Sequence, residues 1–242
     1  MSLSRGSGIK ALGIRARFEK ATTQPARDEA LASLQSLLAD TSTSTPMTRL
    51  TAAHVYLAQG NMNSNALEMV HSGDTLEHLA ISVQIHLSID RPDLAREILG
   101  LMKSRDEEAV PTQIAACHVY CHAGKSESAE AVHIVRALSE QYGPSPMLLN
   151  MTAVGLAVSG DYEAAAMCLA EAAAAEGTTP GADTLVNAAA ISRQKAASGS
   201  EVEMNAAVSS MRAAYPEHSF VKGLDRFEVA FERESVKYVV RS

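Results

Sequence analysis

Apolar residues recur through most of the chain at intervals of three and four, the spacing that lines one face of an α-helix. One arrangement returns several times: an apolar helical segment, a short polar turn, and a second helical segment whose first turn carries a small residue. The clearest copy covers Leu148–Ser159, a turn at Gly160-Asp161, and a second segment from Tyr162 to Ala172. The pattern therefore predicts antiparallel helix pairs that follow one another along the chain.

The turns set the length of the repeat. Earlier copies turn at Gly60 and at Gly124. The small residues that follow three of the turns, Ala95, Ala129 and Ala165, lie 34 and 36 residues apart, and a small residue there lets two helices approach closely. A period near 34 with two helices per unit is typical of tetratricopeptide repeats. We therefore expect an all-α fold, a right-handed α-solenoid of tetratricopeptide-like helix-turn-helix repeats.

The C-terminal end carries one strong apolar stripe. After about Ser219, large apolar residues recur at helical spacing and include three of the four phenylalanines: Phe220, Leu224, Phe227, Phe231 and Tyr238. This stripe predicts a capping helix packed on the last repeat. Before it, an irregular fifth repeat begins at Thr184, and its turn is loosened by extra residues at 197–200.

The N-terminal end has two interpretations. Ile9, Leu12, Ala16 and Phe18 fit an amphipathic helix of an incomplete first repeat, preceded by a flexible leader over residues 1–8 that is rich in Ser and Gly. The alternative is a mitochondrial transit peptide, because residues 1–18 are basic and contain no Asp or Glu. We favour the first interpretation and expect a single solenoid domain over residues 9–242, with about five helix pairs.

Composition narrows the possible functions. Of the 242 residues, 28 are acidic and 21 are basic, which gives a net charge of -7. This excess of acidic residues disfavours binding to the phosphate backbone of a nucleic acid. Aromatic residues make up only 4% of the chain, which disfavours an all-β fold. The odd number of cysteines, three, argues against a disulfide-stapled secreted domain and favours a reducing compartment.

Two segments resemble sites of chemistry. Cys117, His118, Cys121 and His122 have a spacing that a zinc ion could use on one helix, but a structural zinc site draws its ligands from two elements. The preferred interpretation is that Cys117 packs and the histidines line a surface. Gly124-Lys125-Ser126 resembles the end of a phosphate loop, yet its first glycine position falls inside a predicted helix. We therefore predict no catalytic residue, metal site or cofactor, and no enzyme activity.

Several runs resemble the epsilon subunit family of coatomer. They occur in the family's order from about Asp28 to the C-terminus, and include Ala52–Leu57, Gly73–Glu77, Val83–Ile85, Asp93–Arg96, Asp106–Glu108 with Thr112–Ala115, Leu149-Asn150, Glu163–Ala165, Thr184–Asn187, Pro216–His218 and Val221-Lys222. The family normally has a further helical repeat before this segment, so the resemblance implies a shortened or divergent N-terminus.

The resemblance implies a structural function. Family members belong to the COPI vesicle coat, which serves Golgi-to-ER retrograde and intra-Golgi transport on the cytosolic face of Golgi membranes. Their repeats bind and stabilise the C-terminal part of the alpha coatomer subunit. This implies a cytoplasmic hetero-oligomer that contacts the membrane only through the coat, with no nucleic acid or small-molecule substrate.

A stack of helix pairs presents its first helices along a concave surface. Counting along one face of those helices predicts the residues that line it: Leu50, His54, Leu57, Gln84, Leu87, Ile114, His118, Cys121, Asn150 and Val154. The alternative function is a tetratricopeptide adaptor or co-chaperone that captures a different peptide. A clamp for a carboxylate terminus needs Lys, Arg and Asn in this groove, and the predicted residues are mostly apolar or neutral His.

Overall fold

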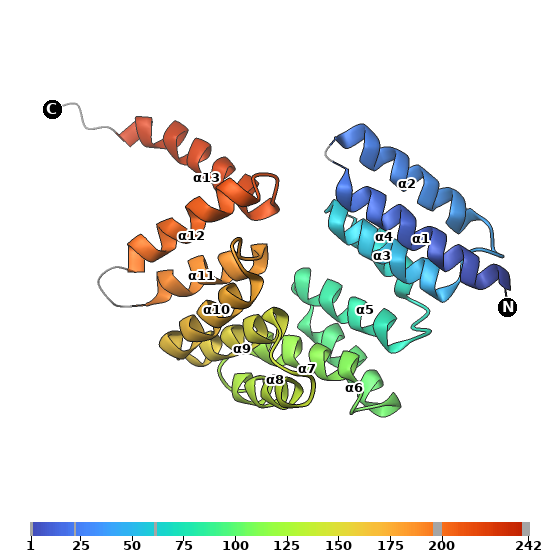
Figure 1. The fold of residues 1–242 in the computed structure, drawn as a ribbon, viewed down its shortest axis with the longest axis horizontal. Helices are drawn as coiled ribbons and strands as arrows, with labels where there is room; N and C mark the ends of the chain where they lie inside the picture. The colour runs from blue at the N-terminus through green and yellow to red at the C-terminus, as the bar shows by residue number, and fades with distance from the viewer. Residues whose placement is uncertain (1, 22, 61, 196–199, 239–242) are drawn as a thin grey trace. The chain divides into compact units, whose positions relative to one another are not determined.

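The computed structural model describes residues 2–21, 23–60, 62–195 and 200–238, and within them it forms thirteen α-helices, one 3-10 turn and no strand (Figure 1). The all-α prediction is confirmed. None of the helices in this described part combines the length and apolar character that a membrane-spanning helix requires.

The chain divides into two compact units, residues 1–122 and residues 123–242. The helices that begin in the first unit are α1 (Ser2–Lys20), α2 (Gln24–Ala39), α3 (Pro46–Gln59), α4 (Asn63–Val70), α5 (Leu76–Ser88), α6 (Pro92–Arg105) and α7 (Val110–Ala123). The second unit contains α8 (Ser128–Tyr142), α9 (Pro146–Ser159), α10 (Tyr162–Glu176), α11 (Ala182–Gln194), α12 (Ser200–Ala214), α13 (Ser219–Ser235) and the 3-10 turn Val236–Tyr238. The repeat pattern predicts one solenoid domain, and that remains a prediction.

The core of the first unit is continuous from α1 to α5. It joins buried residues from five helices, among them Phe18, Leu34, Tyr56, Val70 and Ile85. Helix α3 packs on both α1 and α4, and α5 packs on α6. Further along, Lys103 Nζ of α6 donates to the hydroxyl of Tyr120 at 3.1 Å, which fixes α7 beside α6. Apolar packing thus joins α1 to α5, and a side-chain hydrogen bond links α6 to α7.

Two clusters of buried side chains stand out among the described residues of the second unit. In the first, Val132, Leu156 and Leu169 connect α8, α9 and α10. Gly155 is needed here, because a Cβ at this position would lie 2.7 Å from Cγ2 of Val132. In the second core, Leu185 of α11 packs with Met211 of α12 and Val221 of α13 (buried residues at 7%, 1% and 4% exposure).

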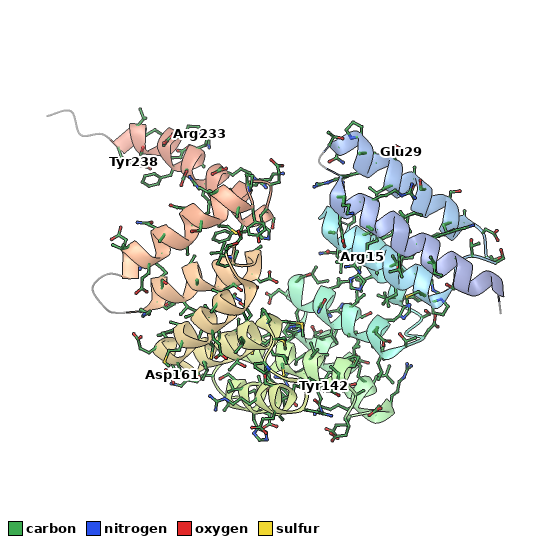
Figure 2. All side chains as sticks on the ribbon, in the orientation of Figure 1. Arg15, Glu29, Tyr142, Asp161, Arg233 and Tyr238 are labelled. Carbon is green, nitrogen blue, oxygen red and sulfur yellow. The ribbon has the colours of Figure 1, made fainter. Side chains whose placement is uncertain are left out.

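The turns within the helix pairs are sharp because one residue adopts a left-handed backbone. Gly60, Gly124 and Gly160 have φ angles of 74°, 90° and 97°, and Asp90 occupies the same place with φ 57°. Glycine reaches this region without a steric penalty. Asp161, labelled in Figure 2, follows the last of these turns, and its Oδ1 accepts from the backbone N of Ala164 at 3.1 Å to cap α10.

Helix α1 differs from its prediction at two points. It begins at Ser2, and Ser7 and Gly8 are buried, so residues 2–8 belong to a helix and do not form a separate leader. Of the predicted stripe only Phe18 is buried. Ile9 and Leu12 are 70% and 45% exposed and Ala16 is exposed as well, whereas Ser7, Gly8, Ala11 and Ile14 complete the buried face.

Two further corrections concern α8 and α13. Ala129 is exposed and Ala131 is buried, because the turn after Gly124 is longer than those after Asp90 and Gly160. Ala95 and Ala165 are buried as predicted.

In α13 only the first turns of the predicted stripe are packed. The later members Phe227, Phe231 and Tyr238 are 76%, 74% and 81% exposed. The loosened turn predicted at 197–200 lies outside the described residues, except for Ser200 at the start of α12.

Candidate partner-binding surface

Four first helices, α3, α5, α7 and α9, share one register. Prolines stand at the first positions of α3 and α9, where Thr45 and Ser145 accept from the backbone N of Thr48 and Leu148. A turn residue with positive φ follows each helix: Gly60, Gly124 and Gly160 come directly after α3, α7 and α9, and Asp90 lies two residues after the end of α5. Counting back from that residue therefore gives equivalent positions in all four helices.

The ten predicted residues occupy three such positions. The third residue before the turn is Leu57, Leu87 or Cys121; the sixth is His54, Gln84, His118 or Val154; the tenth is Leu50, Ile114 or Asn150. We call these positions the first-helix stripe. Two members were missed, Ala80 of α5 and Ala157 of α9, which are both half-buried. Counting from the turns, rather than along each helix alone, would have found them.

Nine of the ten predicted residues have accessible side chains. Gln84 is exposed, and Leu50, His54, Leu57, Leu87, Ile114, His118, Cys121 and Val154 are half-buried. Eight of these nine lie in the first unit, on α3, α5 and α7. Leu50 and Leu57 also pack against the core of that unit, so they form the edge between core and solvent.

Asn150 does not line an open surface. It is 8% exposed, and its Nδ2 donates to the carbonyl of Pro146 at 2.9 Å and to Oγ1 of Thr184 at 2.8 Å. Its Oδ1 accepts from Nδ2 of Asn187 at 2.8 Å. These bonds join α9 to α11, and they use both amide hydrogens of Asn150. The prediction that Asn150 contacts a partner is therefore replaced by a role in packing between repeats.

Burial disfavours the protonated form of both histidines of the stripe, His54 and His118. Burial lowers the pKa of His54 below its ordinary value, and Arg15 of α1 lowers it further. Burial alone lowers the pKa of His118, whose Nδ1 is buried without a hydrogen-bond partner among the described residues. Because no Lys, Arg, Asp or Glu occupies a stripe position of the first unit, this surface is uncharged at neutral pH.

The cysteine and histidine side chains of α7 have separate surroundings. Cys117 is buried in the packing of α7, and burial raises the pKa of the Cys121 thiol. His122 Nε2 lies 3.8 Å from Oδ1 of Asp90. Across the described residues, no three His, Cys, Asp or Glu side chains converge as metal ligands would. Gly124 serves as a turn residue. The arrangement can offer apolar contact and hydrogen bonds to a partner.

The fold has a counterpart among solved structures. A tetratricopeptide repeat protein from Parabacteroides merdae superposes with a TM-score of 0.64 over 83% of this chain and 77% of that protein, at 16% sequence identity. This similarity concerns the fold alone, and it confirms the expected class of helical repeat.

Sequence comparison identifies relatives. Coatomer subunit epsilon-2 of Oryza sativa subsp. indica is 33% identical over 208 residues, covering 86% of this chain and 67% of the relative. Coatomer subunit epsilon-1 of Arabidopsis thaliana is 31% identical, with 86% and 68% covered. Coatomer subunit epsilon of Caenorhabditis elegans is 25% identical, with 90% and 73% covered. The family model for the coatomer epsilon subunit matches residues 4–239. The chain therefore belongs to the coatomer epsilon subunit family.

Proposed function

We propose that this chain is a structural subunit of the COPI coat that binds and stabilises the C-terminal part of the alpha coatomer subunit. Membership of the epsilon family supports a place in the coat. In this proposal the chain works in the cytoplasm, at the cytosolic face of Golgi membranes and COPI vesicles, in retrograde and intra-Golgi transport. It reaches the membrane only through the coat.

The observation that carries the proposal is the uncharged first-helix stripe of the first unit. Leucine, isoleucine and neutral histidine side chains there remain partly open to water, and removing such surface from water favours association. The stripe positions of the first unit carry no charged side chain. A partner segment that covers them therefore does not remove a charge from water, a cost that would offset the gain. The surface thus suits an apolar segment better than an acidic tail.

Gln84 offers the sharpest test because it is the exposed member of the stripe. Gln84→Trp adds bulk without disturbing the core, so helix content by circular dichroism should stay unchanged. Titration calorimetry with the purified C-terminal part of the alpha coatomer subunit should show binding weakened about tenfold or more, since the indole blocks close contact. The matched control is Glu97→Trp, at an exposed site on α6, the second helix of the same pair.

Two results would contradict the proposal. If the unaltered chain has no affinity for the alpha subunit, the assigned partner is wrong. If Gln84→Trp and Glu97→Trp both bind like the unaltered chain, the partner is right but the first-helix stripe is not the surface that it contacts.

A further inference from the structure

Helix α1 exposes a row of apolar side chains. Ile9, Leu12 and Ala16 are separated by three and four residues, so they lie on one side of the helix. Ile9 and Leu12 are 70% and 45% exposed, and Ala16 is exposed as well. The opposite side holds α1 in the core of the first unit through Ile14 and Phe18. The core therefore leaves this side of α1 open, and we call Ile9, Leu12 and Ala16 the α1 row.

Two contacts identify the edge of α1 that adjoins α3, the helix that packs beside it (Figure 1). A Cβ added to Gly8 would lie 3.1 Å from Cγ of Met47, at the start of α3. Two turns further along both helices, the charge of Arg15 lowers the pKa of His54, a member of the first-helix stripe, and the charge of Glu19 raises it. One edge of α1, from Gly8 to Glu19, thus follows α3 along the stripe.

Leu12 lies on this edge, because it is four residues after Gly8 and three before Arg15. On α3, Met47 is 50% exposed and Leu50 is half-buried. Leu12 therefore continues on α1 the partly open apolar side chains that Met47 and Leu50 present on α3. The apolar surface of the first unit thus extends beyond α3, α5 and α7 to α1.

The charges on this edge of α1 balance each other. Arg15 Nε pairs with Oε1 of Glu19 at 2.7 Å, so the edge presents a partner with no net charge. Lys10 and Arg17 are exposed as well, but their helical positions turn them to another side of α1. An acidic segment would be attracted to Lys10 and Arg17, whereas an apolar segment fits the α1 row.

The α1 row is too small to hold a partner alone. Three aliphatic side chains offer far less than the roughly 800 Å² per partner that a standard stable interface buries. The row adjoins the first-helix stripe, however, and a segment that is already bound there gains further apolar contact by covering the row. Continuity with the stripe therefore indicates one occupant for both.

We propose that the segment of the alpha coatomer subunit that covers the first-helix stripe extends onto α1 and packs apolar side chains against Ile9, Leu12 and Ala16. This inference rests on the proposed function for the identity of the partner. It adds a fourth helix of the first unit to the partner surface, and it requires the segment to be apolar, rather than acidic, where it meets α1.

Substitutions on two sides of α1 in the full chain test the extension. Ile9→Ser with Leu12→Ser removes apolar contact from the α1 row, and Lys10→Ser with Arg17→Ser changes two exposed residues on another side. Titration calorimetry with the purified C-terminal part of the alpha coatomer subunit should show about tenfold weaker binding for the first pair and no change for the second. Circular dichroism should show the same helix content in both variants.

A second variant covers the case in which the loss of Leu12 loosens α1. Ala16→Trp keeps every buried side chain and adds an indole at an exposed position, so it should block close contact and also weaken binding about tenfold. Lys10→Trp is the matched control and should bind like the unaltered chain. Weaker binding caused only by the substitutions of Lys10 and Arg17 would mean that the segment is acidic, and would overturn the proposal.

Amide hydrogen exchange on the alpha subunit tests whether one segment covers both surfaces. The residues that lose protection with Ala16→Trp should be apolar and should belong to the same stretch of the alpha subunit as those that lose protection with Gln84→Trp. If Gln84→Trp weakens binding and the α1 variants do not, the extension fails while the proposed function stands. If the unaltered chain has no affinity, both fail.

Two other occupants have distinct signatures. Concentration-dependent dimers that Ala16→Trp dissolves would identify a second copy of the chain. Co-sedimentation with vesicles of phosphatidylserine and phosphatidylcholine that the same variant abolishes would identify a lipid surface. Either result would replace the alpha subunit as the occupant of the α1 row.

Discussion

At the scale of single residues, Asn150 separates what a helical period can predict from what it cannot. It lies in phase with Leu50 and Ile114, so the helical period predicts that it lines the partner surface. The structure instead gives it two partners from α11, Thr184 and Asn187. Phase determines which way a side chain points from its own helix. Whether the next repeat supplies a hydrogen-bond partner there depends on packing between repeats.

The Asn150 contacts predict a cost for removing one partner. Asn187→Ala leaves Oδ1 of the nearly buried Asn150 without its donor, and an unsatisfied buried acceptor should lower the free energy of unfolding by about 1–2 kcal/mol. Urea denaturation followed by circular dichroism measures the change. Asn205→Ala, at an exposed site on α12, is the control and should differ from the unaltered chain by less than about 0.5 kcal/mol. Equal losses in the two variants would mean that the bond contributes nothing.

At the scale of elements, amphipathicity predicts that a helix has an apolar face, but it does not say what covers that face. Helix α13 has its predicted stripe, yet only the first turns of the stripe are packed. Helix α1 buries Ser7, Gly8 and Ala11 together with Ile14 and Phe18, because small residues let it lie close to its neighbours, while Ile9 stays in solvent. Large apolar residues were therefore an unreliable guide to the buried side at both ends of the chain.

The two sides of α13 should respond differently to mutation. Val221→Ala removes two buried methyl groups from the contact with Leu185 and Met211, and it should lower the free energy of unfolding by about 2 kcal/mol. Val229→Ala deletes the same groups from an exposed position and should have little effect on thermal unfolding. A loss at Val229 as large as that at Val221 would show that α13 is packed through the other face.

At the scale of the whole molecule, the class of fold was predictable because period, turn and small residue all repeat. The same signals indicate neither the length of each turn nor the contacts between neighbouring pairs. Turn length explains why Ala131 is buried where Ala129 was predicted to be. Nine of the ten predicted stripe residues have accessible side chains. Their phase could be predicted because a turn residue, a glycine or Asp90, marks where each first helix stops and so fixes the position from which its residues are counted. Their role in binding remains a prediction.

Titration should affect the stability of the first unit. Burial is the main cause of a lowered pKa for His54, His78, His86 and His118. The unfolded chain takes up protons near the ordinary value of 6.5, while the folded chain resists protonation. The unfolded state therefore binds more protons below that pH, and stability should fall as pH drops through 6.5. Urea midpoints at about pH 7.5 and about pH 5.5 measure this loss.

A single substitution tests the source of that pH dependence. His118→Leu removes a group that resists protonation, so the difference between the two midpoints should narrow. Gln141→Leu, at an exposed site on α8 that carries no titratable group, should leave the difference as it is. If the urea midpoint of the unaltered chain is the same at both pH values, the expected loss of stability at low pH is wrong.

The positive-φ turns also constrain how genes for such chains can change in length. One residue inserted between Pro146 and Gly160 would rotate the preceding part of α9 by about 100° relative to its turn, and would exchange accessible positions for buried ones. An insertion in the connection Gly177–Gly181, after the second helix of the pair, leaves that count untouched. Insertions and deletions among related genes should therefore collect between helix pairs, and the first helices should keep their length.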